Sequence, residues 1–142
     1  MSGQPVVREE SPAVTAYNDG VKLLQAKQYQ HAQAKFEEAV KRDPRFAEAH
    51  NNLAFTLRKQ SKANFPQSLE HYNTAIQLKP GLAQAYEYRG VLYAQMGRRS
   101  DALADLAKLR TLNPKLAQEL DQYLKTGKED NDSYGTTKSV SY

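Results

Sequence analysis

The chain has 142 residues, of which 39% are apolar and 25% charged, which suits a single globular domain with a core of its own. It contains no apolar run of even ten residues, so we expect neither a transmembrane helix nor the hydrophobic segment of a signal peptide. Because there is no cysteine, disulfides and thiolate metal sites are excluded. We therefore expect a soluble protein, with the cytoplasm slightly favoured over the periplasm; the first residues leave open whether a leader has been removed.

The net charge of +4 is unevenly distributed along the chain. Residues 13–116 hold 16 basic and 9 acidic side chains, whereas residues 117–142 hold 3 basic and 5 acidic ones. A basic body favours an acidic partner, but its Lys and Arg residues are scattered and form no dense run. Nucleic-acid binding is therefore a minor alternative, because phosphate-binding surfaces cluster their positive charge.

The first twelve residues carry too little apolar surface to offset the entropy of ordering, so we expect 1–12 to be disordered. Paired amphipathic helices are then predicted at residues 13–26, 29–42, 47–60, 66–79, 83–96 and 99–112. Each pair ends at a proline dipeptide, and these dipeptides lie 36 and 34 residues apart: Asp43-Pro44, Lys79-Pro80 and Asn113-Pro114. This period indicates three copies of one helical-hairpin unit. The two additional residues of the second unit fall in the turn-rich stretch 61–66.

Two glycines, Gly20 and Gly90, interrupt the helical pattern at equivalent positions, which predicts a close approach between helices there. Beyond the third unit, a further amphipathic helix is predicted at 117–126, and its apolar face would cover that unit. This face consists of Leu116, Leu120, Tyr123 and Leu124. We expect the helix to end near Gly127 and residues 127–142 to form a disordered, acidic and polar tail.

Corresponding positions of the three units carry small, aromatic and aliphatic residues in the same order. The first unit has Gly20, Leu23, Tyr29, Ala32, Phe36, Ala39 and Pro44; the second has Leu53, Ala54, Leu57, Tyr72, Ala75 and Pro80; the third has Tyr86, Gly90, Tyr93, Ala102, Leu106 and Pro114. This pattern resembles the tetratricopeptide repeat (TPR). The resemblance implies an all-α fold, a right-handed α-solenoid of the repeats 13–46, 47–82 and 83–116 plus the capping helix, together a domain of residues 13–126. The sequence departs from the family pattern at Asp19, His50, Ser68, Arg89 and Leu109.

The groups that catalysis needs do not converge in this sequence. The histidines, His31, His50 and His71, share no i, i+4 spacing, so a packing or surface role is expected for each rather than metal binding. There is no cysteine nucleophile and no glycine-rich phosphate loop. We therefore predict no enzymatic activity, no metal, no cofactor and no small-molecule substrate, and a role as a protein-binding scaffold or adaptor.

The resemblance implies that the first helix of each unit lines a concave groove. The candidate partner-binding residues on that face are Tyr17, Val21, Leu24, Asn51, Phe55, Arg58, Lys59, Glu87 and Val91. We hypothesise that a peptide or a partner helix lays apolar side chains along an apolar strip of this face, while Arg58 and Lys59 meet a carboxylate. The alternatives are that Leu24 or Phe55 packs within the fold, and that the two cations are solvated.

One specialised mode of binding is not predicted. Members of the family that hold the acidic C-terminus of chaperones use lysine, asparagine and arginine at particular groove positions. The corresponding residues here are Tyr17, Val21, Asn52, Gln84 and Tyr88, of which only Asn52 matches. We expect the partner to be another protein or a peptide, acidic or with a free carboxylate, but not through a chaperone-tail clamp.

A second interpretation is a structural protein that assembles into homo-oligomers through its repeat faces. The first unit has no obvious N-terminal cap, and Phe65 in the inserted turn is expected to be an exposed aromatic. A further idea concerns residues 127–142, which at about 3.3 Å each extend roughly 50 Å and end in a carboxylate next to the ring of Tyr142. Such a tail can reach back to the groove or remain disordered. The sequence identifies neither the partner, nor the pathway, nor the oligomeric state.

Overall fold

The computed structural model describes residues 10–129, and within them it contains α-helices, one short 3-10 turn and no strand. The elements are α1 (Pro12–Gln25), α2 (Tyr29–Arg42), α3 (Ala47–Gln60), η1 (Lys62–Asn64), α4 (Phe65–Leu78), α5 (Ala83–Gln95), α6 (Arg99–Leu112) and α7 (Pro114–Thr126). Each predicted repeat helix agrees with the structure to within one residue at either end. The predicted all-α helical-repeat fold is confirmed.

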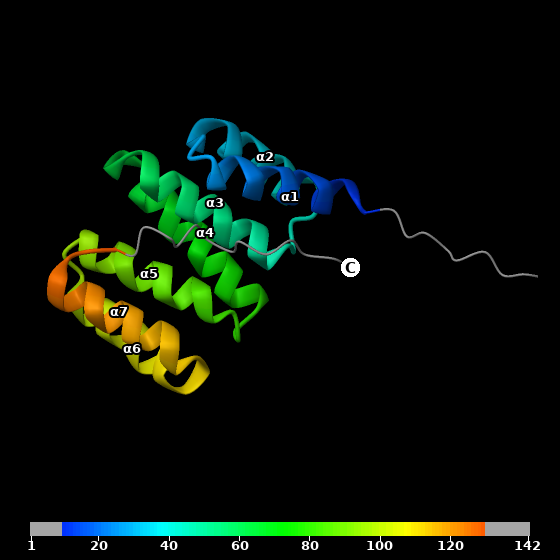
Figure 1. The fold of residues 1–142 in the computed structure, drawn as a ribbon. Helices are drawn as coiled ribbons and strands as arrows, with labels where there is room; N and C mark the ends of the chain where they lie inside the picture. The colour runs from blue at the N-terminus through cyan, green and yellow to red at the C-terminus, as the bar shows by residue number, and fades with distance from the viewer. Residues whose placement is uncertain (1–9, 130–142) are drawn as a thin grey trace, which may run out of the picture.

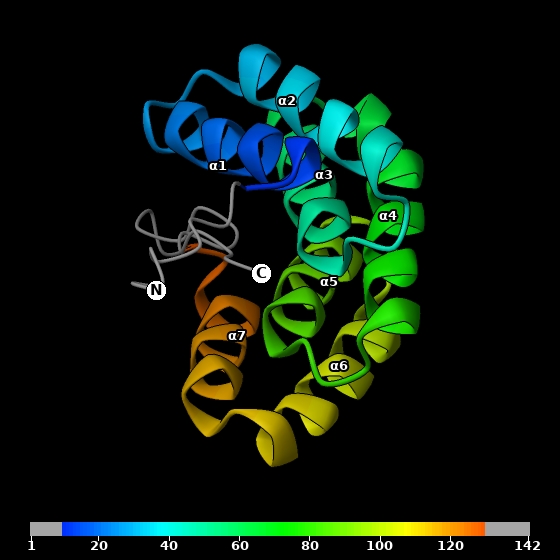
Figure 2. The same ribbon diagram turned by 90° about the vertical axis from the view of Figure 1, so that its right-hand side faces the viewer.

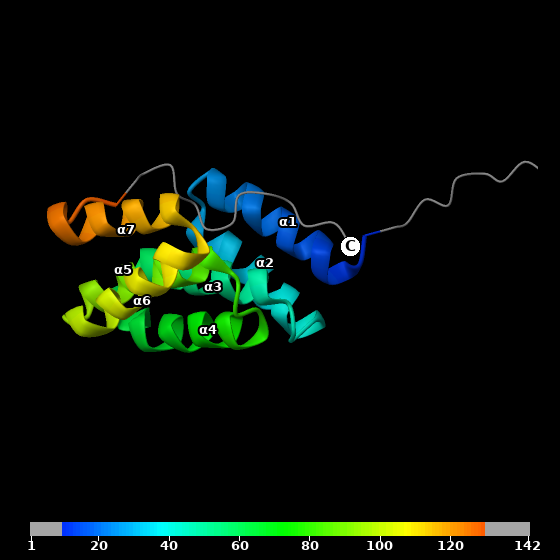
Figure 3. The same ribbon diagram turned by 90° about the horizontal axis from the view of Figure 1, so that it is seen from below.

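The helices form hairpins that stack side by side (Figure 1): α1 with α2, α3 with α4, and α5 with α6. Figure 2 shows that the stack is curved, with α1, α3 and α5 on its inner, concave side and α2, α4 and α6 on its outer side. Helix α7 packs against both α5 and α6. Seen from below, α7 and α1 lie on the same side of the stack, opposite α4 (Figure 3). The groove is therefore bordered by α1 at one end and by α7 at the other.

Local residue chemistry explains where several helices begin and end. The hydroxyl of Ser11 accepts a backbone N–H of α1 at 3.2 Å, and the side-chain oxygen of Asn113 accepts one of α7 at 3.1 Å. Gly97 and Gly127 have φ of 75° and 70°, the left-handed conformation that glycine adopts without a steric cost, just after α5 and α7. The expected end of the last helix near Gly127 is thus confirmed, whereas the helix begins at Pro114, three residues before the predicted start at residue 117.

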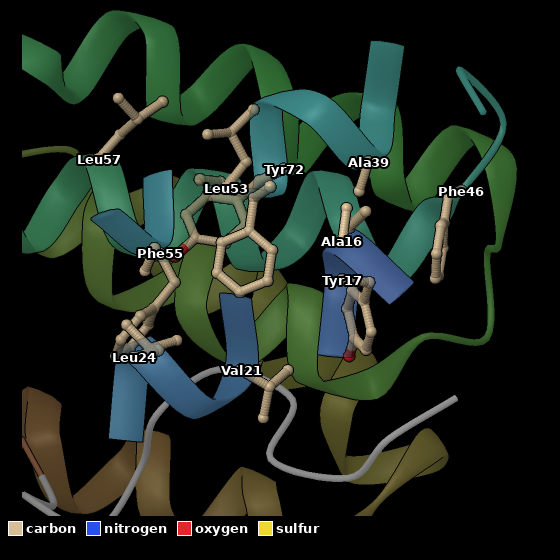
Figure 4. Packing of buried hydrophobic residues seen from close by; sticks show 14 of the residues in the cluster. Ala16, Tyr17, Val21, Leu24, Ala39, Phe46, Leu53, Phe55, Leu57 and Tyr72 are labelled. Carbon is tan, nitrogen blue, oxygen red and sulfur yellow. The ribbon is translucent and has the colours of Figure 1, made fainter. Parts of the chain in front are cut away.

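The buried apolar side chains form two clusters that meet at α5. The larger cluster spans α1 to α4 (Figure 4). It also takes in Tyr88 and Leu92 from α5. The smaller cluster lies between α5, α6 and α7 and contains Tyr86, Val91 and Leu120. Helix α5 therefore contributes to both cores, through different faces.

Some departures from the repeat pattern are compensated by polar contacts between helices. Arg89 replaces an apolar residue, and its guanidinium forms two hydrogen bonds with Asp105 of α6, at 2.6 and 3.0 Å. It also lies over the ring of Tyr93, 5.4 Å from the ring centre. Ser68 replaces an alanine, and its hydroxyl donates to the backbone carbonyl of Ala54 at 2.7 Å. In both cases, the polar group that departs from the repeat pattern has a hydrogen-bonding partner in another helix.

The prediction that Phe65 is an exposed aromatic is wrong. Its side chain begins α4, is only 8% exposed, and belongs to the larger cluster. The 3-10 turn before it directs the chain inward, and the Asn64 side-chain amide fixes that turn by donating to the Leu57 carbonyl at 3.0 Å. The inserted residues lengthen the turn without adding an apolar surface.

The predicted close approach of helices at Gly20 and Gly90 is confirmed. A Cβ atom at Gly20 would lie 2.6 to 2.9 Å from ring atoms of Phe36 in α2, whose side chain is fully buried. At Gly90, a Cβ would lie 2.6 and 3.0 Å from the two terminal carbons of Leu120 in α7. The aromatic ring is rigid, whereas the leucine can change its rotamer.

We expect Gly20→Ala to lower the free energy of unfolding by about 1–2 kcal/mol, because overpacking against Phe36 outweighs the gain in helix propensity. Gly90→Ala should have a smaller effect, since Leu120 can yield. Urea unfolding followed by circular dichroism measures both. A Gly20→Ala chain as stable as the wild type would contradict the packing described here.

A pair of histidines joins α3 to α4 within the second repeat. The rings of His50 and His71 are stacked, with centres 5.3 Å apart and their Nδ1 atoms 3.1 Å apart. His50 Nε2 lies 2.9 Å from the carbonyl oxygen of Pro44, which can only accept, so Nε2 carries the hydrogen. In the neutral pair, His50 Nδ1 must then accept from His71 Nδ1. Burial, followed by the neighbouring His50, lowers the pKa of His71, against an opposite effect of Glu70 and Glu37.

This pair predicts a loss of stability in mild acid. Because the pKa of His71 is lower in the folded than in the unfolded chain, stability is complete above pH about 6.5 and falls as the pH drops below that value. We expect His71→Gln to flatten this dependence in unfolding experiments between pH 7 and 5. His31→Gln, at an exposed histidine of α2, is the matched control and should keep the wild-type slope. An identical slope in all three chains would refute the assignment.

Candidate functional site

The candidate residues all lie on the first helices of the three hairpins, on the concave side. Helix α1 carries Tyr17, Val21 and Leu24; α3 carries Asn51, Phe55, Arg58 and Lys59; α5 carries Glu87 and Val91. Contacts between neighbouring helices connect them: the ring of Phe55 lies 4.9 Å from that of Tyr88 in α5, centre to centre. The structure therefore brings residues from different repeats together on this face.

All of these candidate residues except Lys59 are buried. Tyr17, Leu24 and Phe55 are fully buried and, together with Val21, belong to the larger hydrophobic cluster (Figure 4). The ring centre of Tyr17 lies 4.9 Å from that of Phe46, the residue directly before α3. Leu24 and Phe55 thus pack within the fold, as the alternative interpretation expects. The apolar strip is part of the core that shapes the groove.

The polar centre of the concave face is a carboxylate-binding pair of cations. Arg58 donates from Nη2 to Glu129 Oε1 at 2.6 Å and from Nη1 to Glu129 Oε2 at 3.1 Å, a two-point contact with the segment that follows α7. Lys59 Nζ lies 3.8 Å from the same carboxylate. The guanidinium of Arg58 is also held by Gln95 of α5, at 3.4 Å, and lies over the ring of Phe55. Side chains of α3 and α5 therefore position Arg58 toward a carboxylate.

The electrostatics of this contact favour the ionised form of both partners. Burial raises the pKa of Glu129, but the hydrogen bond and charge of Arg58, with Lys59 beside them, outweigh burial and hold that pKa below its ordinary value. Burial acts to lower the pKa of Arg58, whereas Tyr72 and Glu129 raise it, and the net effect is a rise. At neutral pH the contact therefore joins an ionised carboxylate to a guanidinium cation.

A cavity of about 400 Å³ adjoins this pair of cations, between α5 and α7. Its walls combine apolar side chains with carboxylates: Tyr88, Val91, Leu120 and Tyr123 beside Glu87, Glu119 and Glu129. A second hollow of about 550 Å³ opens on the other side of Glu129, at the end of α3, where Arg58, Lys59 and Gln95 line it. Apolar and charged recognition are thus adjacent along the groove.

The sequence missed Glu129, Leu120 and Tyr123 as parts of this site. Leu120 and Tyr123 were assigned only to covering the third repeat, and Glu129 was assigned to a disordered tail. Glu129 instead contacts Arg58 of α3, whereas residues 130–142 of that tail and residues 1–9 lie outside the described residues. No local pattern marks Glu129, because its partner is 71 positions away in the sequence.

Other kinds of site are not found in the part of the chain that the structure describes. Residues 10–129 contain no group of three or more His, Cys, Asp and Glu side chains that could hold a metal ion. Among the helices of these residues, none is both long and apolar enough to span a lipid bilayer. The concave face is accordingly the feature on which a functional interpretation depends.

Comparison with known families points to helical repeats. A family model described as a TPR repeat matches residues 62–97, and one described as a tetratricopeptide repeat matches residues 35–64. Among curated proteins, the Hsp70-Hsp90 organizing protein of Triticum aestivum is 28% identical over 102 residues, which are 72% of this chain and 17% of that protein. The chain thus spans less than a fifth of the length of this relative.

Solved structures show the same architecture. The TPR2B domain of yeast Sti1, determined in a complex with pHsp70, superimposes with a TM-score of 0.73 at 25% identity, covering 80% of this chain and 94% of that one. The first TPR domain of Spaghetti (RPAP3), bound to the HSP90 peptide SRMEEVD, superimposes with a TM-score of 0.72 at 19% identity, covering 85% and 99%. The latter similarity concerns the fold alone.

The two cations of the concave face should differ in their contribution to stability. The Arg58 side chain is 1% exposed and makes the short bonds to Glu129, whereas Lys59 is 31% exposed and lies farther away. We expect Arg58→Gln to lower the free energy of unfolding by about 1–3 kcal/mol, and Lys59→Gln by less than about 1 kcal/mol. Thermal unfolding of both variants decides this, and equal losses would contradict the difference in burial.

Proposed function

The chain is a tetratricopeptide repeat protein, and from that premise we propose that it is a scaffold whose concave face binds a segment of another protein. The segment carries a carboxylate that pairs with Arg58 and Lys59, and apolar side chains that enter the cavity between α5 and α7. It is an extended peptide or a helix, because both present side chains along one line. No catalytic step belongs to this proposal.

The observation that carries the proposal is the contact between Arg58 and Glu129. Arg58 is held by residues of two repeats and meets a carboxylate through two nitrogen atoms, which is the geometry in which guanidinium groups recognise carboxylates. In this chain the carboxylate comes from Glu129, at the end of the described segment. A partner that displaces Glu129 would find the cations already positioned, so little ordering of side chains is needed on binding.

The cavity between α5 and α7 supplies the apolar half of the recognition. Tyr88, Val91, Leu120 and Tyr123 line it, and Glu129 belongs to its rim. A volume of about 400 Å³ suits one or two large side chains and is in the range of small binding pockets. A carboxylate next to an aromatic or aliphatic residue is therefore the sequence feature that we expect in the partner.

The partners of the similar proteins are not carried over unchanged. The RPAP3 domain was solved with an HSP90 peptide and the Sti1 domain with pHsp70. In the present chain Tyr17 and Val21, at two of the positions that correspond to chaperone-binding residues, are apolar and buried in the core. We propose that the groove selects another acidic segment and discriminates against the chaperone tail.

The alternative of self-assembly through repeat faces is not favoured by the surface of residues 10–129. Within that range, the exposed large hydrophobic residues are Leu103 and Leu112, both on α6. Single exposed leucines are ordinary on soluble proteins, whereas assembly through helical faces needs a contiguous apolar patch. The proposal therefore remains a partner-binding groove.

A phage-displayed library of random peptides tests this function without knowledge of the partner. We expect enriched peptides to combine an acidic residue with a neighbouring apolar or aromatic one. Lys59→Glu should weaken a synthetic enriched peptide about tenfold, equivalent to about 1.4 kcal/mol. Lys108→Glu, at an exposed lysine of α6 on the outer side, is the matched control and should bind as the wild type does.

Fluorescence anisotropy with the synthetic peptide gives the affinities, and circular dichroism checks that both variants fold. The peptide SRMEEVD serves as a specificity probe and should bind more weakly than the enriched peptide. Equal affinity of the enriched peptide for the Lys59→Glu and Lys108→Glu chains would rule out the concave face as the binding surface.

A further inference from the structure

The segment after α7 turns back onto the concave face. Gly127 has a left-handed conformation with φ of 70°, and its N–H donates to the Tyr123 carbonyl at 2.7 Å, which ends the helix. Two residues later, Glu129 reaches Arg58 of α3. Figure 2 shows this segment, in orange, leaving α7 on the inner side of the curve, in the space between α7 and α1.

We propose that residues 130–142 continue from Glu129 along the concave face toward α1, so that the C-terminal segment of the chain occupies its own partner-binding groove. The proposal rests on the proposed function, because it takes the concave face to be a binding surface. It makes the chain self-inhibited: a partner must displace this segment before it can bind.

The length of the segment is sufficient. Thirteen residues follow Glu129, and at about 3.3 Å each they extend to roughly 43 Å. Neighbouring packed helices lie about 8–10 Å apart, so the step from α3 to α1 takes only a few residues. Helix α1 has 14 residues and is about 21 Å long at 1.5 Å per residue. The segment can therefore run from Arg58 along the full length of α1.

The charges of the two parts are complementary. Residues 10–129 contain 18 basic and 13 acidic side chains, whereas residues 130–142 contain two Asp and one Lys. The attachment point itself is an acidic residue held by two cations. Attraction between the basic body and this acidic segment thus favours the same placement of the segment as the contact at Glu129.

The composition of the segment suits the cavity that Glu129 lines. The segment combines Ser, Thr and Asn with Tyr134, Val140 and Tyr142, so it can present apolar side chains among polar ones. The cavity beside Glu129 is lined by Tyr88, Val91, Leu120 and Tyr123.

The covalent connection makes even a weak contact effective. A short flexible linker gives an effective concentration on the order of 1 mM. A segment with an intrinsic dissociation constant of about 0.1 mM would then occupy the groove in about nine molecules of ten. The apparent Kd of a partner rises about tenfold in consequence. Glu129→Gln, which weakens the anchor, should lower the Kd of a library-derived peptide by up to this factor.

The absence of cysteine permits a direct experiment on the full chain without any partner. Ser139→Cys introduces a single thiol, and a nitroxide attached to it broadens the amide signals of nearby residues in a 15N-labelled chain. We expect loss of signals from the concave-side residues of α1 and α3, and none from the outer helices α2 and α4. Reduction of the nitroxide should restore the signals.

Two controls make this result decisive. Glu129→Gln should restore most of the lost signals, whereas Asp121→Asn should not, because it removes a carboxylate on α7 that pairs only with Lys125 in the next turn. Unchanged signals throughout would overturn the proposal. So would equal signal loss when a 14N chain that carries the nitroxide is mixed with a 15N chain that carries none, since the segment would then come from a second copy.

The outcome is independent of the test of the proposed function. If the nitroxide leaves the amide signals unaffected but Lys59→Glu weakens binding of the library peptide, the chain binds partners through an unoccupied groove. If the nitroxide broadens the signals of the concave side but Lys59→Glu leaves the peptide affinity unchanged, the chain holds its own C-terminal segment on a face that binds no other peptide.

Discussion

The stack depends on how closely its helices approach one another. At Gly20 the ring of Phe36 occupies the space that a side chain would need, and at Gly90 the side chain of Leu120 does so. A hairpin of this kind cannot bury its apolar face alone, so the stacked hairpins share a core. The contact at Gly20 holds α1 against α2 within the first hairpin, and the contact at Gly90 holds α7 against α5 at the end of the stack.

The helices were predictable because their signals are local. Apolar periodicity, the repeated proline dipeptides and Gly127 locate the helix ends, and the structure agrees closely. The polar contacts between helices could not be predicted, because nothing in the sequence connects Arg89 with Asp105, or His50 with His71, before the helices are packed. The predicted exposure of Phe65 failed for the same reason, since burial depends on how the inserted turn directs the chain.

The candidate site was predictable in its location, but not in its chemistry. The repeat pattern assigns the candidate residues to the helices that form the concave side, and Arg58 and Lys59 were expected to meet a carboxylate. It does not show that Tyr17 and Leu24 are core residues, nor that Glu129 meets Arg58. Proteins that share a repeat fold commonly differ in their groove residues. Packing constrains the helices, whereas recognition depends on a few side chains.

Helix α5 belongs to two separate clusters, and this has a mechanical consequence. Tyr88 and Leu92 join it to the four helices before it, whereas Tyr86 and Val91 join it to the two helices after it. In repeat proteins each layer contacts only its neighbours, so a small rotation at one layer is not resisted by distant ones. Helix α5 is therefore the layer through which the packing of one cluster is coupled to that of the other. Its packing against both clusters fixes the distance between α1 and α7, and with it the width of the space that an occupant of the concave side can fill.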